Sequence, residues 1–569
     1  MKRDGTFSYL AEIIIFLIII LVYASAFLAV RNKSANLPAT DVSILYYDDA
    51  IILYDRFRSE GIKGLGQTTF YMPGYLALTA AVLALLNMNC MLTTLVMNLF
   101  SLTLLLFSAY LLGRKISDRL TAIAICATAA LCPVIYLHFP AYFLDFPVLW
   151  ALVLSAFMLL MSDYFMELKW SLLLSAACAA GSMINFTFGV YAAGIILSGL
   201  IIAVNDARKK DYRRLLNFGL FFIFLAALIG PYHSDPDRIK LIFSQPFIEA
   251  DSAPWYYPRI IRIFLSGLWD TQLSPPIFFL VLYGVCILIK KKDKRLFLLL
   301  SMWILLPHLI LVPMPHWKAA RYLMPLMPAY AVFGGIGARS LLREKTGAAL
   351  FSMILALGIF QYYDFSRGEN SVLTARSEGR IRYFINRFYP EMLWKKEGPQ
   401  NVLFERVKEE IRRMGQSRET EKRIPVILID NYDWNGFNFL ANHQFRLLLR
   451  FHNIDGIEVI AANDSENIDF RELLFNNIDG KKVRLIIDVT LEEDAYYESD
   501  IPSFMNPEYF NRGRSEKRAV QTRNQNFKIT GPLPEEYQKR FTRLVGKKET
   551  VIKQMKAQKY LRADIYTLK

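Results

Sequence analysis

The chain has 569 residues, of which 54% are hydrophobic, and its mean hydropathy is +0.26. These values, together with 41 Phe and 30 Tyr, exceed what one soluble core needs and are typical of a polytopic membrane protein. The net charge of +15 arises from short Lys and Arg clusters between apolar segments, a pattern that argues against a nucleic-acid-binding protein.

About eleven apolar segments are long enough to cross a bilayer. The first, at 10–30, follows Met1-Lys2-Arg3 and resembles a signal peptide, but its length favours an uncleaved helix. The others cover about 91–112, 119–137, 142–162, 170–184, 186–204, 215–232, 275–290, 295–312, 322–342 and 347–363.

The apolar segment 71–86 is short, and the distribution of charge decides its place. If it lies at or re-enters the outer interface, every basic cluster falls on the side of the N-terminus, as the positive-inside rule requires. We therefore predict a cytoplasmic N-terminus, outer loops at 31–90 and 233–274, and shorter outer segments around 138–145 and at 313–321. The clusters are Lys2-Arg3, Arg114-Lys115 with Arg119, Arg208–Lys210 with Arg213-Arg214, Lys290–Lys292 with Lys294-Arg295, and Arg339 with Arg343 and Lys345.

The composition changes to mixed charge beyond about residue 365. We predict a transmembrane domain at 1–364 and a separate periplasmic or extracellular α/β domain at 365–569. Its expected buried strands are 424–429, 457–460 and 483–487, with helical stretches between the first two and before the third. We also expect an extended loop at 496–528 and a helix followed by a strand in 534–569.

Two acidic positions are candidates for catalysis. Asp48 and Asp49 lie among Tyr residues beside an expected interfacial helix at 50–57, where partial desolvation favours a general base. The alternative for this pair is a helix cap. Asp145 opens a membrane segment in aromatic surroundings, where an ionisable group needs a partner or a task, and its alternative is also an N-cap.

A basic pair lies on the predicted outer side, where the positive-inside rule disfavours cations. Lys318 and Arg321 are three residues apart, so a helix would direct both side chains the same way. Arg and Lys suit a phosphate group held at the membrane surface. The alternative is that both side chains extend to lipid headgroups.

These elements, in this order, resemble the GT-C glycosyltransferases, and most of all the branch containing protein O-mannosyltransferases and the lipid A aminoarabinose transferase. The matching features are Asp48-Asp49, the aromatic and proline-containing segment 70–75, Asp145-Phe146-Pro147 and the run from Lys318 to Pro328. The resemblance covers about the first 365 residues and rests on order and shared sidedness. The chain departs from the family in having Asp49 where Glu is frequent and Met72 where Pro is frequent, and only His138 where a basic residue usually precedes the later Asp.

The resemblance implies an inverting transferase that uses a polyprenyl-phosphate sugar as donor and a lipid, glycan or protein hydroxyl as acceptor at the outer face. Asp48 or Asp49 would then be the base, Asp145 would help to position acceptor or donor, and Lys318 with Arg321 would hold the leaving phosphate. Further candidates for substrate binding are Tyr71, His138, His316 and Tyr322.

No cofactor is expected. A divalent metal near His138, His233 and His316 is the less favoured alternative, since scattered histidines more often cap or hydrogen-bond. The five cysteines show no C-x-x-C spacing and support neither a zinc site nor a disulfide framework. The sequence also lacks the usual phosphate-loop and serine-nucleophile motifs.

Two other functional classes compete with the transferase. A transporter or flippase of lipid-linked glycans usually places ionisable groups near the bilayer midplane, whereas these lie at the outer ends of segments. A membrane-anchored binding protein would act through its C-terminal domain. All three readings place the chain in the cytoplasmic (inner) membrane among membrane lipids, with no nucleic-acid partner.

Overall fold

The computed structural model describes residues 5–31, 41–61, 72–86, 89–233, 268, 272–311 and 320–366, together with five strands between 424 and 568. Contacts between residues divide the chain into two units, Met1–Trp394 and Lys395–Lys569. The predicted domain boundary at 364/365 stays a prediction.

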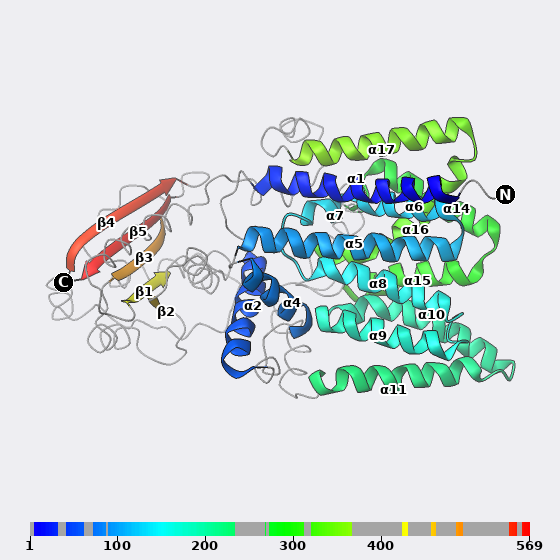
Figure 1. Cartoon of the computed structure of the whole chain (residues 1–569), viewed down its shortest axis with the longest axis horizontal. Helices are drawn as coiled ribbons and strands as arrows, with labels where there is room; N and C mark the ends of the chain where they lie inside the picture. The colour runs from blue at the N-terminus through cyan, green and yellow to red at the C-terminus, as the bar shows by residue number, and fades with distance from the viewer. Residues whose placement is uncertain are drawn as a thin grey trace. The chain divides into compact units, whose positions relative to one another are not determined.

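The described part of the first unit is helical (Figure 1). Its helices are α1 Gly5–Arg31, α2 Asp41–Glu60, α4 Pro73–Leu85, α5 Cys90–Ile116, α6 Arg119–Ala130, α7 Pro133–His138, α8 Asp145–Met161, α9 Leu168–Ile184, α10 Phe188–Arg208, α11 Arg213–His233, α14 Pro275–Lys291, α15 Lys294–Leu311, the 3-10 helix η3 Ala320–Leu326, α16 Met327–Leu341 and α17 Lys345–Ser366.

Most of the apolar segments predicted from the sequence overlap one helix of the first unit, but 119–137 is divided between α6 and α7, and 322–342 between η3 and α16. Among the described residues, 6 helices are long and apolar enough to cross a membrane by themselves, namely α1, α5, α10, α11, α15 and α17. The protein is thus a polytopic helical membrane protein, while the number of eleven spans stays a prediction.

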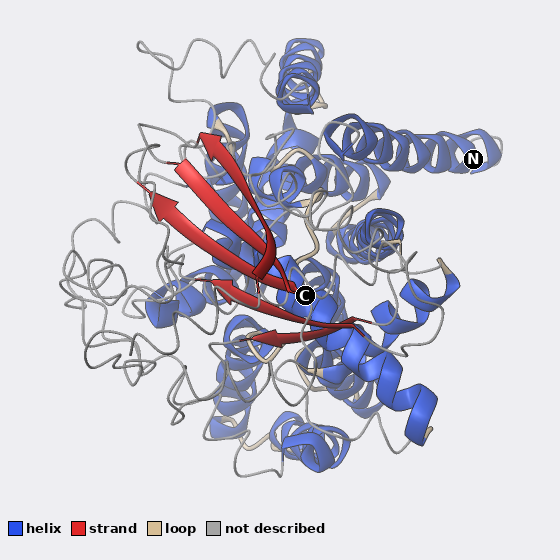
Figure 2. Ribbon diagram, turned by 90° about the vertical axis from the view of Figure 1, so that its left-hand side faces the viewer, coloured by secondary structure: helices blue, strands red, loops and turns tan. Residues whose placement is uncertain are grey.

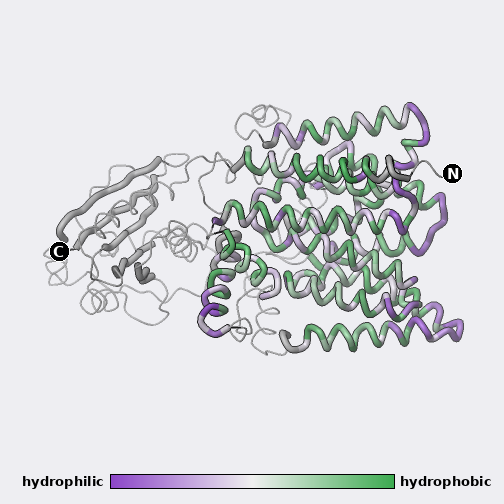
Figure 3. The backbone as a smooth tube through the Cα atoms, in the orientation of Figure 1, coloured by the Kyte–Doolittle hydropathy of each residue, from purple (hydrophilic) through white to green (hydrophobic). Residues whose placement is uncertain are grey.

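Hydrophilic turns lie at one end of the helical unit (Figure 3). We call it the basic end, because α5, α10, α14 and α16 end there with basic residues in their last turns, namely Arg114, Lys115, Arg208, Lys290, Lys291 and Arg339. Here the Asp118 side chain caps α6 and accepts a hydrogen bond of 2.7 Å from Arg339 Nε of α16. The neighbouring Arg119 Nε lies 2.9 Å from Glu12 Oε1 of α1. These contacts bring the ends of α1, α6 and α16 together, in agreement with the shared sidedness of the basic clusters.

Two helices, α2 and α4, pack on each other and lie across the far end of the bundle instead of along it (Figure 1). With 13 residues, α4 is about 20 Å long, shorter than the hydrocarbon core of a bilayer. This length agrees with the prediction that 71–86 is not a full span. The amphipathic α2 buries Tyr46, Tyr47, Ile51 and Leu53 and exposes Phe57.

The described part of the second unit is one mixed sheet of strand order β2-β1-β3-β5-β4 (Figure 2). The parallel strands are β1 Ile424–Asp430, β2 Ile457–Ala461 and β3 Leu485–Glu492. β1 and β2 lie at their predicted positions, and β3 overlaps the predicted 483–487 but extends beyond it. Two antiparallel strands, β4 Val545–Gln554 and β5 Tyr560–Leu568, occupy the C-terminal stretch, where a single strand was expected. The helices predicted between strands lie outside the described residues, so the α/β character of this domain stays a prediction.

Candidate functional site

The acidic pair lies well inside a helix. Asp48 and Asp49 belong to α2, which begins at Asp41, so the alternative that they cap a helix start is wrong. Asp49 is half-buried, and its neighbours Tyr47 and Ala50 are fully buried. The backbone of Asp48 is described and its side chain is not. Asp49 therefore borders the buried face of α2.

The buried Tyr142 ring joins α2 and α4 to the segment that leads into α8. Its centroid lies 4.7 Å from that of Tyr47, with the rings 30° apart, and 6.1 Å from that of Tyr46 in an edge-on contact. On the α4 side the Tyr75 ring is nearly parallel to it at 6.2 Å. Because Tyr142 lies three residues before Asp145, these contacts bring the acidic pair and Asp145 into one region.

Hydroxyl groups fix two of these rings to α5. The Tyr47 hydroxyl is 2.5 Å from Thr94 Oγ1, and the Tyr75 hydroxyl is 2.8 Å from Ser101 Oγ. All four groups are buried. Buried hydroxyls that are bonded in this way restrict ring orientation, because breaking the bond leaves a polar group in an apolar interior.

One side-chain amide makes two hydrogen bonds to the backbone between α7 and α8. Asn98 Nδ2 of α5 donates to the carbonyl oxygens of Phe139 at 2.6 Å and Ala141 at 2.9 Å. A buried Asn in an otherwise apolar membrane helix is costly unless it is bonded. Asn98 therefore positions the segment that carries Tyr142 and Asp145.

Asp145 is the first residue of α8 and is only 1% exposed. The capping position is taken by Leu144, without a side-chain cap bond, so the N-cap alternative for Asp145 is wrong. One carboxylate oxygen accepts a hydrogen bond of 3.3 Å from Asn185 Nδ2, which lies between α9 and α10. Since α8 runs from Asp145 to the basic end, Asp145 lies at the opposite end of the unit.

The predicted phosphate-binding run is described only from Ala320 onwards. Arg321 and Tyr322 belong to η3, which packs against α7 and α8. The Tyr322 carbonyl accepts a hydrogen bond of 2.7 Å from the Tyr191 hydroxyl in the first turn of α10. The Arg321 side chain, Lys318, His316 and Tyr71 lie outside the described residues. The backbone of Arg321 is thus on an element that touches the helix of Asp145.

His138 ends α7 and is fully buried. Its Nδ1 lies 2.6 Å from the Val134 carbonyl oxygen, to which it donates, and its ring meets Phe143 edge-on at 5.5 Å. The described residues contain no group of three His, Cys, Asp or Glu side chains that could hold a metal ion. His233 is the last residue of α11, and its side chain lies outside the described residues. His316 lies wholly outside them.

The structure thus brings together α2 with the acidic pair, segment 139–145 and η3. Sequence reasoning missed Tyr142, Asn98 and Asn185, the residues that join these parts. The signal for Asn98 was present, since a lone Asn in an apolar helix usually has a partner. Tyr142 was part of an apolar run whose role only the packing reveals.

No protein-family model and no curated protein sequence matches the chain. Among solved structures it is similar to ArnT from Cupriavidus metallidurans in the apo state, with a TM-score of 0.51 and 11% identity over 85% of this chain and 93% of that one. The same protein bound to undecaprenyl phosphate gives a TM-score of 0.52 and 12% identity over 97% and 98%. A weaker similarity, with a TM-score of 0.44 and 12% identity over 83% and 67%, is to the Archaeoglobus fulgidus oligosaccharyltransferase in complex with Zn and sulfate.

Sequence identities this low show a shared fold but no shared activity or substrate. The fold assignment rests on ArnT, because that comparison covers nearly the whole of both chains. It agrees with the helical architecture of the first unit. The protein therefore has the fold of ArnT, the GT-C fold.

Proposed function

We propose that the protein is an inverting glycosyltransferase that moves a sugar from a polyprenyl-phosphate donor to a hydroxyl of a lipid, glycan or protein acceptor. The GT-C fold and the undecaprenyl phosphate bound to ArnT support a polyprenyl-phosphate donor. The observation that carries the proposal is the stacking of Tyr47 on Tyr142, which places the helix of Asp48 and Asp49 against the segment that ends in Asp145.

The reaction needs one base and an assisted leaving group. Asp48 or Asp49 accepts the proton of the acceptor hydroxyl, whose oxygen attacks the anomeric carbon of the donor. The bond from that carbon to the phosphate oxygen breaks, its electron pair leaves with polyprenyl phosphate, and the configuration inverts. The half-buried site and aromatic neighbours of Asp49 suit this task, because partial desolvation makes a carboxylate more basic.

The leaving phosphate is assigned to Arg321 and Lys318. A guanidinium can hold two phosphate oxygens at once, and an ammonium adds a point charge. The hydrogen bond from the Tyr191 hydroxyl to the Tyr322 carbonyl oxygen fixes the η3 backbone next to Arg321. Tyr71 and His316 remain candidates for substrate contact, whereas the bond of His138 within its own helix favours a role in supporting segment 139–145.

Asp145 is assigned to positioning. It is buried and bonded to Asn185, so it can orient an acceptor or sugar hydroxyl without changing its own place. The positive-inside pattern favours the outer face of the cytoplasmic membrane for this chemistry, with the N-terminus in the cytoplasm.

The test uses the purified full-length chain in proteoliposomes with a panel of polyprenyl-phosphate sugars and a cell-envelope extract as acceptor. We expect one class of donor to yield polyprenyl phosphate, read by mass spectrometry, and an equal amount of glycosylated acceptor. Movement of a labelled lipid-linked glycan across the bilayer without any glycosyl product would instead establish the flippase alternative.

A further inference from the structure

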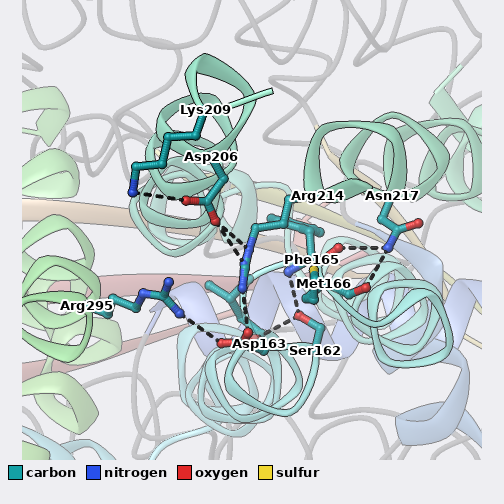
Figure 4. Close-up of polar contacts among 10 residues, drawn as sticks. Ser162, Asp163, Phe165, Met166, Asp206, Lys209, Arg214, Asn217 and Arg295 are labelled. Atoms are coloured by element: carbon teal, nitrogen blue, oxygen red, sulfur yellow. Dashed lines mark hydrogen bonds and ion pairs between the residues drawn. The ribbon is translucent and has the colours of Figure 1, made fainter. Parts of the chain in front are cut away.

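Three turns at the basic end are tied together by ion pairs around Asp163 (Figure 4). Asp163 lies in the α8–α9 turn. Its Oδ2 is 2.5 Å from Arg214 Nη2 of α11, and its Oδ1 is 3.2 Å from Arg295 Nη1 of α15. Arg214 also reaches Asp206 of α10, with Nε 3.1 Å from Oδ2. The α10–α11 and α14–α15 turns are therefore fixed on either side of the α8–α9 turn.

The α8–α9 turn has a strained backbone. Asp163, Tyr164 and Phe165 have φ values of 45°, 54° and 70°, a left-handed backbone that side chains with a Cβ disfavour. Asn217 Nδ2 of α11 donates to the carbonyl oxygens of Phe165 at 2.8 Å and Met166 at 3.0 Å. These hydrogen bonds and the ion pairs hold the strained turn in place between the α10–α11 and α14–α15 turns.

The two flanking turns carry a large excess of positive charge. Residues 206–214 and 290–295 contain ten Lys and Arg and three Asp. Each Asp is engaged within the turns, because Asp206 pairs with Arg214, Asp211 accepts from the Arg213 amide and Asp293 accepts from the Leu296 amide. The exposed cations include Arg208, Lys209, Lys210, Arg213 and, in the second turn, Lys290, Lys291, Lys292 and Lys294.

Both turns place a lysine where the backbone favours glycine. Lys210 follows α10 with a φ of 69°, and Lys292 caps α14 with a φ of 56°. Glycine takes this conformation without steric cost and is the usual residue after a helix. The backbone conformation therefore does not explain why lysine occupies these two positions, and its charge is the remaining property that could.

We infer that the two lysine turns form a binding surface for the headgroups of anionic phospholipids. Exposed apolar residues begin directly beside them, with Leu216 66% exposed on α11 and Ile289 57% exposed on α14, which sets the turns at the level of lipid headgroups. Lysine ammonium groups at this level attract anionic lipids. This binding surface lies at the opposite end from Asp145 and does not depend on the proposed transfer reaction.

The test measures thermal unfolding of the full-length protein in nanodiscs of phosphatidylcholine, with and without phosphatidylglycerol. We expect phosphatidylglycerol to raise the Tm of the parent. The double variant Lys210→Gly, Lys292→Gly should unfold no earlier than the parent in phosphatidylcholine, because the backbone strain is relieved, yet lose most of the rise. The charge-conserving variant Lys210→Arg, Lys292→Arg should keep the rise.

A matched variant removes two exposed cations elsewhere at the same end, Arg114→Gln with Lys115→Gln, and should also keep the rise. The inference is overturned if the double glycine variant keeps the full rise. It is equally overturned if the matched variant loses as much of the rise in Tm, because the effect of phosphatidylglycerol would then come from the overall positive charge of this end and not from the two lysine turns. A rise of the same size from inorganic phosphate in phosphatidylcholine discs would show that the surface takes free anions and not lipid.

Discussion

The ring of Tyr142 helps to position the acidic pair. It contacts Tyr46 and Tyr47 of α2 and Tyr75 of α4, and it precedes Asp145 by three residues. Without this ring α2 would lose its main aromatic contact with the segment before α8. Its hydroxyl, bonded to Thr79 Oγ1, is a smaller part of this arrangement.

Replacing Tyr142 separates the two contributions. Tyr142→Phe should cost about 1 kcal/mol and keep transfer, because the ring stays and Thr79 Oγ1 still donates to the Tyr75 carbonyl. Tyr142→Ala should cost about 3–5 kcal/mol and slow transfer about 100-fold through displacement of α2. Thermal unfolding and release of polyprenyl phosphate measure both effects, and a parent rate in Tyr142→Ala would refute the role of the ring.

At the basic end, Asp118 makes stability depend on pH. Partial burial alone would raise the pKa of this carboxyl, but hydrogen bonds from the Thr121 amide and hydroxyl, together with the Arg339 guanidinium, hold it below its usual value. Because the folded-state pKa is the lower one, the ionised group stabilises the fold above about pH 4, and this contribution is lost as the pH falls further. Asp118→Asn should keep the cap but show a smaller fall in Tm between pH 7 and pH 3. Equal falls would contradict this assignment.

At the scale of helices, α14 and α16 pack backbone to backbone. A Cβ on Gly284 would lie 1.8 Å from the Phe333 carbonyl oxygen, and one on Gly337 would lie 2.5 Å from that of Leu280. Small residues allow such close approach between membrane helices. Since α16 continues from η3, this contact also supports the element that carries Arg321.

Gly284→Ala should therefore lower the free energy of unfolding by about 3 kcal/mol or more, because neither backbone can yield without parting the helices. The control is Gly219→Ala in α11, where no atom lies within 4 Å of the new Cβ. It should be neutral or gain up to about 1 kcal/mol from helix propensity. Equal unfolding midpoints in denaturant for the two variants would contradict the close packing of α14 and α16.

The sequence predicted the elements well where apolar length decides them and less well where tertiary contacts do. Hydrophobic segments predicted the long helices, and short apolar runs predicted β1 to β3. The interfacial helix was expected at 50–57, whereas α2 runs from Asp41 to Glu60. Its first half contains β-branched and aromatic residues of low helix propensity, and packing of Tyr46 and Tyr47 on Tyr142 compensates for that.

For the molecule as a whole, the sequence indicated which residues lie at the same end of the helical unit, but not which of them are in contact. The positive-inside rule needs only the order of charges and apolar segments. The bond between Asp118 and Arg339 joins residues 221 positions apart and depends on helix packing. The same holds for the candidate site, where motif order predicted the acids and packing revealed the roles of Tyr142 and Asn185.

The two ends should face opposite sides of the membrane. In a chain without its native cysteines, Phe57→Cys on α2 should react with a membrane-impermeant maleimide added to intact spheroplasts. Lys209→Cys at the basic end should react only after lysis. Both side chains are well exposed, so access and not burial limits labelling. Labelling of both from the same side would overturn the predicted topology.

The most direct test of the central claim is the rate of sugar transfer in three variants of α2. Removing the base should slow transfer about 10²–10⁴-fold in Asp48→Asn or Asp49→Asn, with Tm near that of the parent. The matched control is Asp55→Asn, an exposed acid on the same helix, which should transfer at the parent rate. If Asp48→Asn and Asp49→Asn both transfer sugar at the parent rate, the acidic pair of α2 is not the catalytic base.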